Sequence, residues 1–342
     1  MSLRTDICAS RLFSRLGTTL ALGAFLAAGA SGGAQAQSSD AADTTKIVVG
    51  SSGSGFSQVP YYVALQQDLF KKAGVNVDNQ VLNGGTTAAM AAFASGSLNV
   101  VILSAPELIP YVAHKVASGK AFAEMVDQGY DVVVSKDITS FPQLKGKTIG
   151  LSTPNSADYF FLVATLQHYG IAANDVTFIT SGNPLNRLAT LAAGAIQATA
   201  ATNAQRADVA KIGTILLKSG DNPVGFPQVM FVANDDLLKN HKPLLKKFVA
   251  VMQQATEWIK ANPTDAAASC AKALNSTPEV CGPAIALNFD RSVSSPFTWS
   301  STYGVNVTGV KSALAVMGTL DATAQSLTVD DVADTSVAGT TP

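Results

Sequence analysis

The chain has 342 residues, of which 47% are hydrophobic and 14% are charged, and its formal net charge is −1. This balance supplies enough apolar surface for two compact lobes and excludes an intrinsically disordered chain. Because there is no basic excess to attract a phosphate backbone, we expect no nucleic-acid partner.

The amino terminus has the three parts of a secretory signal. Three arginines precede an apolar run from Leu16 to Ala28, and the small-residue sequence Ala34-Gln35-Ala36 follows it. The alternative is a membrane anchor, but the run is shorter than the roughly 20 residues that a spanning helix needs. We therefore expect residues 1–36 to be a signal peptide, cleaved near Ala36, and the remaining chain to be exported to the periplasm.

Two cysteines, Cys270 and Cys281, remain after this cleavage and enclose a short polar stretch. An oxidising compartment favours their pairing, so we predict a disulfide; the alternative is two separate buried thiols. The three histidines are scattered without the spacing of metal ligands, and we expect neither a metal nor another cofactor.

Two stretches of the chain repeat the order β-α-β-α-β. The first has strands at 46–50, 75–82 and 98–103, a helix at 59–72 and an Ala-rich helix opened by Asn83-Gly84-Gly85-Thr86-Thr87. The second has strands at 147–151, 176–180 and 195–201 and helices at 157–169 and 184–193. Helix-ending glycines recur at almost constant offsets, Gly74 with Gly170 and Gly96 with Gly194. This pattern predicts an α/β protein with two Rossmann-like lobes, each built on a parallel sheet covered by helices.

The last third of the chain does not begin a third copy. It starts with a strand at 229–233 and continues as helices, including an amphipathic one at 243–260. We expect it to return to the first lobe, which makes that lobe discontinuous and gives the chain a hinge between lobes. The predicted organisation is lobe 1 at 46–132 plus 228–330, lobe 2 at 133–227, and a flexible polar tail at 331–342.

A set of short motifs marks the helix ends and strand starts. They are Ala64-x-x-x-Asp68-Leu69-Phe70-x-x-Ala73-Gly74-Val75, Ala91-Ala92-Phe93-Ala94-Ser95-Gly96-Ser97-Leu98-Asn99, Leu144-Lys145-Gly146-Lys147-Thr148-Ile149-Gly150 and Tyr169-Gly170-Ile171-x-x-Asn174-Asp175-Val176. Together they resemble periplasmic substrate-binding proteins of ABC importers, of the sulfonate, nitrate, taurine and thiamine-precursor (pyrimidine) type. Asn99 and Gln197 stand where that family often carries Asp, and residues 201–204 replace an acidic-proline pair. We expect these departures to affect the ligand and not the fold.

The resemblance implies the type II periplasmic-binding-protein architecture, with a ligand held in a cleft between the lobes and delivered to an ABC permease in the inner membrane. We expect a monomer. The low charge of the candidate loops favours a small organic ligand: a sulfonate, an aromatic carboxylate or a pyrimidine-like molecule.

Ligands of open parallel sheets bind beyond the carboxyl ends of the strands, where helix starts present backbone N–H groups. Polar side chains there can cap the helix or bind a ligand, and nearby aromatic side chains can hold an organic ring. Arg206 follows the last strand of lobe 2 and could clamp a carboxylate or sulfonate, although a solvated arginine is the alternative. The candidate ligand-binding residues are Phe56, Gln58, Tyr61, Gly85, Thr86, Ser104, Asn155, Ser156, Tyr159, Asn203, Arg206 and Phe226.

No catalytic motif is complete. Gly53-Ser54-Gly55 lacks the third glycine of a dinucleotide-binding loop, and Gly146-Lys147-Thr148 lacks the upstream glycine of a phosphate-binding loop and precedes a strand. A nucleophile elbow of the G-x-S-x-G type is also missing from the strand-to-helix turns. We therefore predict a binding protein and not an enzyme. Two alternatives stay open: a bilobal enzyme such as a precursor-forming transferase, and a sensor that presents its ligand to a receptor.

Overall fold

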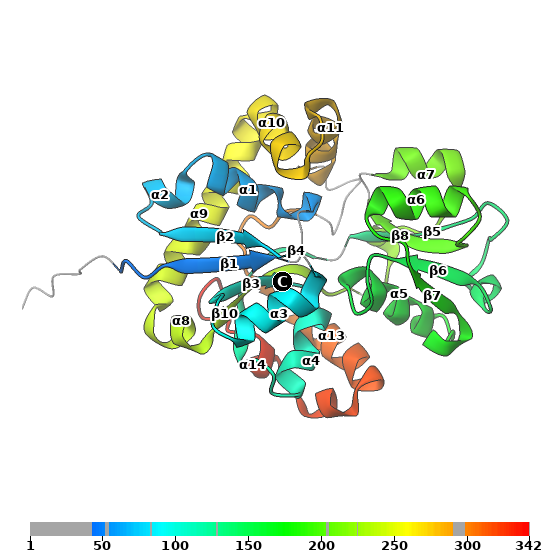
Figure 1. Cartoon of the computed structure of the whole chain (residues 1–342), viewed down its shortest axis with the longest axis horizontal. Helices are drawn as coiled ribbons and strands as arrows, with labels where there is room; N and C mark the ends of the chain where they lie inside the picture. The colour runs from blue at the N-terminus through cyan, green and yellow to red at the C-terminus, as the bar shows by residue number, and fades with distance from the viewer. Residues whose placement is uncertain are drawn as a thin grey trace, which may run out of the picture. The chain divides into compact units, whose positions relative to one another are not determined.

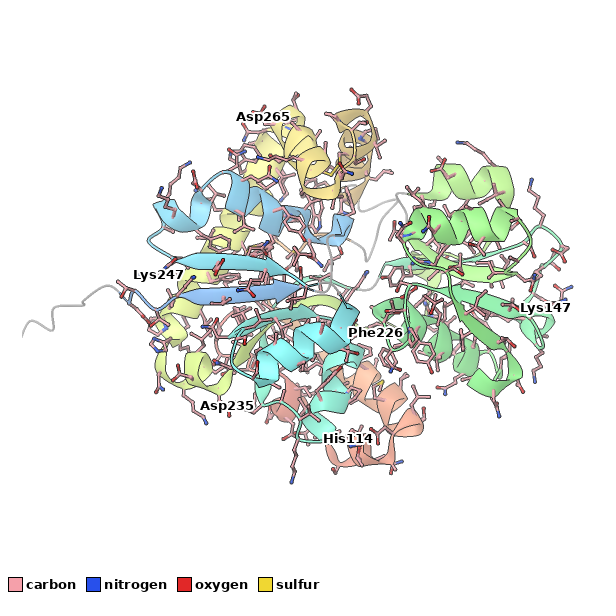
Figure 2. The ribbon with its side chains drawn as sticks, viewed as in Figure 1. His114, Lys147, Phe226, Asp235, Lys247 and Asp265 are labelled. Atoms are coloured by element: carbon pink, nitrogen blue, oxygen red, sulfur yellow. A yellow bond between two sulfur atoms is a disulfide. The ribbon has the colours of Figure 1, made fainter. Side chains whose placement is uncertain are left out.

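The computed structural model describes residues 43–51, 55–82, 84–127, 129–202, 205–223, 225–289 and 298–341. The predicted signal peptide, residues 1–36, and the candidate residue Asn203 lie outside the described residues. Residues 42–342 form one compact unit, whose elements are labelled in Figure 1. Figure 2 adds the side chains, with exposed charged or polar groups such as Asp265 and His114 at the periphery.

The first lobe is built on a five-stranded sheet with the order β2-β1-β3-β10-β4. Its strands are β1 (Ile47–Ser51), β2 (Val77–Val81), β3 (Val100–Leu103), β4 (Gly119–Asp127) and β10 (Pro227–Asn234). The predicted parallel order holds for β1 with β2 and β3. The sheet as a whole is mixed, however, because β10 returns from the distant carboxyl-terminal third and runs antiparallel to both β3 and β4.

The second lobe repeats this arrangement with the order β7-β6-β8-β5-β9. Its strands are β5 (Tyr130–Val134), β6 (Thr148–Leu151), β7 (Thr177–Thr180), β8 (Ala198–Thr202) and β9 (Thr214–Leu217). β6 pairs in parallel with β7 and β8, whereas β5 runs antiparallel to β8 and β9. In each lobe the antiparallel strand therefore stands beside the third parallel strand, which confirms the prediction of two similar α/β lobes.

Helices surround both sheets (Figure 1). Those of the first lobe are α1 (Val59–Gln66), α2 (Leu69–Lys72), α3 (Gly85–Ala94), α4 (Ala105–Ala113), α8 (Asp235–Asn240), α9 (Lys242–Ala261), α10 (Pro263–Leu274), α11 (Pro278–Phe289), α13 (Val307–Leu320) and α14 (Val329–Val332). Those of the second lobe are α5 (Ala157–His168), α6 (Pro184–Ala192) and α7 (Arg206–Ile212). The single helix predicted at 59–72 is two helices, because Asp68 adopts a left-handed conformation with φ 54°. Among the described residues, no helix is both long and apolar enough to cross a membrane.

The chain passes from the first sheet to the second between Asp127 and Tyr130 and returns between Leu217 and Pro227. The first crossing is earlier than the expected boundary after residue 132, because Tyr130, Asp131 and Val132 already pair with β8. β5 therefore belongs wholly to the second lobe.

The carboxyl-terminal segment is packed against the first lobe, so the prediction of a flexible tail is wrong for residues 331–341. Val332, Ala333 and Val337 are buried, and Ala333 forms a bridge with Ala121 of β4. The short strand β12 (Thr340–Thr341) pairs in parallel with β11 (Val305–Asn306). A few apolar residues spaced through a polar sequence are enough to hold the segment, and composition alone does not reveal them.

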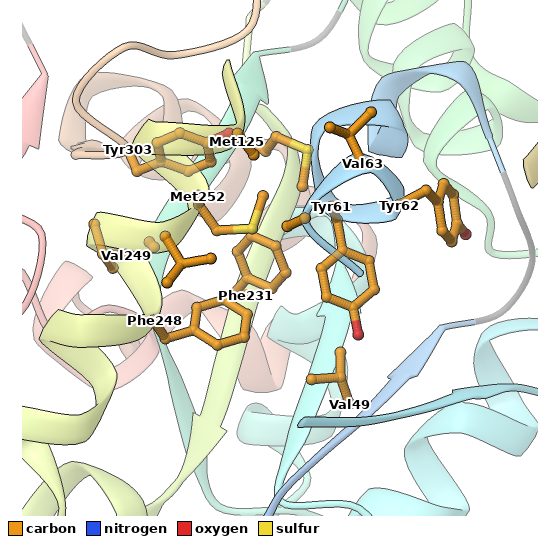
Figure 3. Close-up of a cluster of buried hydrophobic side chains, with 14 of the residues drawn as sticks. Val49, Tyr61, Tyr62, Val63, Met125, Phe231, Phe248, Val249, Met252 and Tyr303 are labelled. Carbon is orange, nitrogen blue, oxygen red and sulfur yellow. The ribbon is translucent and has the colours of Figure 1, made fainter. Parts of the chain in front are cut away.

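The predicted disulfide between Cys270 and Cys281 is present and joins α10 to α11. Both cysteines are buried in the larger hydrophobic cluster of the first lobe, which also contains an aromatic group around Phe231 and Phe248 (Figure 3). The ring centroids of Phe231 and Phe248 are 5.0 Å apart in an edge-to-face arrangement.

Candidate ligand-binding site

A polar cavity of about 280 Å³ is lined by residues from both lobes. Ser104 directly follows β3 and Ser152 directly follows β6, so the cavity lies beyond the carboxyl ends of parallel strands, where the sequence predicts a ligand site. The polar side chains that line it are Ser57, Gln58, Thr86, Ser104, Glu107, Tyr130, Ser152, Thr153, Ser156, Asp158 and Gln228.

Glu107 is the buried carboxyl group that the first lobe contributes, and it is only 8% exposed. The Ser104 backbone N–H donates to Glu107 Oε2 at 2.8 Å, while Ser104 Oγ accepts from the Glu107 backbone N–H at 3.3 Å. This capping box fixes the start of α4. Thr86 Oγ1, from the first turn of α3, donates to Glu107 Oε1 at 2.6 Å. Burial raises the pKa of Glu107, and the hydrogen bonds from Thr86 and Ser104 partly offset this effect.

Asp158 is the corresponding carboxyl group of the second lobe and is 2% exposed. It accepts hydrogen bonds from the Ser152 backbone N–H at 2.8 Å and from the hydroxyls of Ser152 and Ser156, both at 2.5 Å. Arg187 lies behind it, with Nη1 3.6 Å from Asp158 Oδ2. The charge of Asp158 is therefore balanced within the second lobe.

Two further lining residues follow the points where the chain crosses between the sheets. Tyr130 is the first residue of β5, and Gln228 is the second residue of β10. Gln228 Oε1 accepts a hydrogen bond from the Gly129 backbone N–H at 3.3 Å. Burial, followed by the nearby charge of Asp158, raises the pKa of the Tyr130 phenol, which therefore stays protonated at neutral pH.

A second cavity of about 650 Å³ adjoins the first and shares four of its lining residues. The shared residues are Gly85, Thr86, Glu107 and Thr153. The second cavity is more apolar, because Pro110, Tyr111, Pro154, Tyr159, Phe160, Met317 and Leu320 contribute to its wall. Together the two cavities offer one polar and one largely apolar compartment.

The structure brings many of the sequence-predicted residues to these cavities. Gln58, Gly85, Thr86, Ser104 and Ser156 line the polar cavity. Asn155 and Tyr159 line the apolar one. Gln58 Oε1 accepts a hydrogen bond from the Tyr62 hydroxyl at 2.9 Å.

Three predicted aromatic residues lie elsewhere. Tyr61 is 0% exposed and packs in the core, with its ring 5.8 Å from that of Phe231 (Figure 3). Phe226, labelled in Figure 2, is fully buried in the second hydrophobic cluster. Phe56 stacks on Trp299 at 5.4 Å and is absent from the lining of either cavity.

Arg206 also lies outside both cavities, because it forms an ion pair with Asp131 of β5. Conversely, Glu107, Tyr130, Asp158 and Gln228 line the polar cavity without having been singled out from the sequence. Glu107 does carry a sequence signal, since it stands three residues after Ser104 at a strand-to-helix junction, as a capping box requires. In the described part of the chain, no group of three or more His, Cys, Asp or Glu side chains is arranged to hold a metal ion.

Two similar α/β lobes joined by two crossings, with a cavity lined by both, define the bilobal periplasmic-binding-protein fold. The model of the NMT1/THI5-like family matches residues 56–266, and the chain belongs to this family. A comparison with curated protein sequences gives no match.

Solved structures share the fold at low sequence identity. The periplasmic aliphatic sulphonate-binding protein SsuA from Escherichia coli aligns with a TM-score of 0.65 and 14% identity, covering 87% of this chain and 94% of that protein. The alkanesulfonate-binding protein SsuA from Xanthomonas axonopodis pv. citri, bound to MOPS, aligns with a TM-score of 0.62 and 16% identity. The alignment covers 81% of this chain and 93% of that protein. The periplasmic nitrate-binding protein NrtA from Synechocystis PCC 6803 aligns with a TM-score of 0.54 and 14% identity. The alignment covers 70% of this chain and 69% of that protein.

Proposed function

We propose that this chain is the solute-binding protein of an ABC import system and that it holds a small organic molecule between its two lobes. The observation that carries the proposal is the polar cavity, whose wall combines Ser104 and Glu107 of the first lobe with Tyr130 and Asp158 of the second. A ligand in this cavity touches both lobes and so favours a closed conformation, which the permease can recognise. The candidate ligand classes are sulfonates, aromatic carboxylates and pyrimidine-like molecules.

Family and fold support this role. The structural neighbours described above include proteins that bind alkanesulfonates and nitrate in the periplasm. The signal-like amino terminus and the disulfide between Cys270 and Cys281 fit an exported protein, because disulfides persist in oxidising compartments. The proposed location is the periplasm, with a monomer delivering its ligand to an inner-membrane permease.

A binding role accounts for the carboxyl groups of the cavity better than catalysis does. Glu107 and Asp158 are each held by several hydrogen bonds from nearby backbone N–H and hydroxyl groups. Such an arrangement fixes the position of a carboxyl group and shapes a polar wall. No nucleophile paired with a base is needed to explain the cavity.

The test is a thermal-shift screen of the mature chain, from Gln37 onward, against sulfonates, aromatic carboxylates, pyrimidines, amino acids and nitrate. A ligand at about 100 times its dissociation constant should stabilise the protein by roughly 2.7 kcal/mol. Mass spectrometry of the recovered compound should show it unchanged. Recovery of a chemically altered compound would instead support the enzyme alternative.

A matched pair of variants tests where the ligand binds. Gln58→Ala removes an amide from the polar cavity, and we expect it to weaken binding about tenfold. Gln67→Ala is the control, because Gln67 follows α1 and its amide lies 3.5 Å from Ser269 Oγ, away from both cavities. Equal affinities for the two variants would place the ligand elsewhere. Uptake of the ligand by cells with and without the gene distinguishes an importer component from a sensor.

A further inference from the structure

We infer that the ligand is an amphiphilic organic cation, whose amine or amidine head contacts Glu107 in the polar cavity and whose apolar body fills the second cavity. This inference rests on the proposed function and changes its ligand class. It departs from the anionic ligands that the sequence favours, for reasons of charge and hydrogen bonding at the two cavities.

The first reason is that the protein's own carboxylates occupy the positions at which an anion would bind. Anionic ligands of α/β sheets accept hydrogen bonds from backbone N–H groups at helix starts. Here the Ser104 N–H before α4 donates to Glu107, and the Ser152 N–H before α5 donates to Asp158. The Thr86 hydroxyl at the start of α3 also donates to Glu107. At these three donors, an anion entering the cavity would meet carboxylate oxygens.

The second reason is the charge balance of the site. Asp158 faces Arg187, and Asp321 in the second cavity pairs with His114 at 2.7 Å. Glu107 has no such partner: in the described part of the chain, no lysine, arginine or histidine lies within ion-pair distance of it. Lysine, arginine and histidine are likewise absent from the described lining of both cavities.

Glu107 also has capacity for another hydrogen bond. Each carboxylate oxygen offers about two lone-pair positions; Oε1 of Glu107 accepts from the Thr86 hydroxyl, and Oε2 accepts from the Ser104 N–H. A buried carboxylate without a counter-charge is unfavourable, and a cationic head group would supply the missing charge. Burial raises the pKa of Glu107, and the nearby charge of Asp158 adds to this effect.

The third reason concerns the body of the ligand. Glu107 lies on the boundary between the cavities and lines both. A molecule whose head binds Glu107 can therefore extend into the larger cavity, where Tyr159, Met317 and Leu320 form part of an apolar wall. Burying an apolar group there adds affinity in proportion to the area removed from water.

Calorimetric titration of the mature protein tests the head group with two compounds that share one apolar body, and tests the body with an amine that lacks it. The probes are 2-phenylethylamine, 2-phenylethanesulfonate and methylamine. We expect 2-phenylethylamine to bind at least tenfold more tightly than the sulfonate, whose charge is opposite, and than methylamine, which lacks the apolar body.

Variants assign the two contacts. Glu107→Gln keeps an oxygen that can accept from the Ser104 N–H but removes the charge, so we expect the affinity for 2-phenylethylamine to fall ten- to hundredfold. Glu257→Gln makes the same chemical change on the exposed face of α9, where Glu257 pairs with Lys260, and should change nothing. Leu320→Ser should weaken the binding of 2-phenylethylamine but not that of methylamine. The control is Leu185→Ser, at an exposed leucine, which should change neither affinity.

The outcomes separate this inference from the proposed function. Tighter binding of the sulfonate, or an affinity for the amine that Glu107→Gln leaves unchanged, overturns the inference and leaves a solute-binding protein standing. Chemical conversion of the bound compounds overturns both the inference and the proposed function. Both are also overturned if neither these probes nor any compound in the wider screen binds.

Discussion

Arg206 binds Asp131 through both arms of its guanidinium group, with Nε 2.6 Å from Oδ2 and Nη2 2.8 Å from Oδ1. The Asp131 side chain is 1% exposed and the Arg206 side chain 21% exposed. Asp131 Oδ1 also accepts from the Ser219 backbone N–H at 2.8 Å. The pair thus ties the start of α7 to β5 and to the segment through which the chain leaves the second lobe.

We predict that Arg206→Ala lowers the free energy of unfolding by about 3 kcal/mol, because it leaves a buried carboxylate without its counter-charge. The free energy of unfolding of Arg206→Lys should lie between those of Arg206→Ala and the wild type, since an ammonium group cannot form both hydrogen bonds. Denaturant unfolding measures the effect, and ligand affinity should stay within about twofold. An Arg206→Ala protein that is stable but does not bind would show that the arginine contacts the ligand after all.

Glu124 should make the protein more stable as the pH falls from neutral. Its carboxyl group is buried and accepts from the Asn306 backbone N–H at 2.7 Å. Burial, and then the nearby charge of Asp127, raise its pKa well above the ordinary value of 4.5. Between that raised pKa and about 4.5 the folded state binds more protons than the unfolded chain, so the free energy of unfolding increases as the pH decreases. Glu107, whose pKa is also raised, contributes to this pH dependence of stability with the same sign.

The variant Glu124→Gln isolates this contribution. It keeps an oxygen for the Asn306 N–H, removes the titration, and should be more stable than the wild type at pH 8. As the pH is lowered from 8 to 5, the free energy of unfolding should rise less steeply for the variant than for the wild type. Parallel curves for the two proteins would contradict the assignment to Glu124.

Removing the disulfide should cost roughly 2–3 kcal/mol of stability, because the bridge closes a loop between residues 11 apart in sequence. The double variant Cys270→Ser, Cys281→Ser tests this by denaturant unfolding. A reducing agent should destabilise the wild type to the same level and leave the double variant unchanged. Since α10 and α11 contribute nothing to either cavity, ligand affinity should be preserved.

The sequence predicts the parallel part of each sheet well, because strands, helices and glycine caps are local features. Gly74 and Gly170 both adopt positive φ, at 71° and 73°, as the repeated helix ends require. The antiparallel strands β10 and β5 depend on pairing between distant segments, which no local pattern encodes. For the same reason the partner of Arg206 stands 75 residues away and could not be foreseen.

Two departures from the family pattern prove to act in the fold. Asn99 Oδ1 accepts from the Val48 N–H at 2.7 Å, and Gln197 Oε1 accepts from the Thr148 N–H at 3.1 Å. Each side chain joins the start of a lobe's third parallel strand to its first strand, and neither lines a cavity. Both amides therefore act within the fold, whereas their effect on the ligand stays a prediction. An amide oxygen accepts from a backbone N–H as a carboxylate does, so the substitution preserves the contact.

The last prediction concerns Gly85, the first residue of α3, which lines both cavities with a φ of 70°. A Cβ atom there would meet nothing closer than Thr153 Oγ1 at 4.0 Å, so Gly85→Ala introduces backbone strain and not a clash. We expect a loss of about 1–2 kcal/mol of stability. We expect relief of the strain to shift Thr86 relative to Glu107, which should also weaken ligand binding.

Gly74→Ala is the matched control for this prediction. Gly74 has almost the same φ, 71°, and open space around its Cβ position, but it lies at the end of α2, away from both cavities. It should lose similar stability, measured by denaturant unfolding, while ligand affinity measured by calorimetry stays at the wild-type value. If both variants bound equally well, the position of the Thr86 hydroxyl relative to Glu107 would have no part in recognition, and the start of α3 would serve the fold alone.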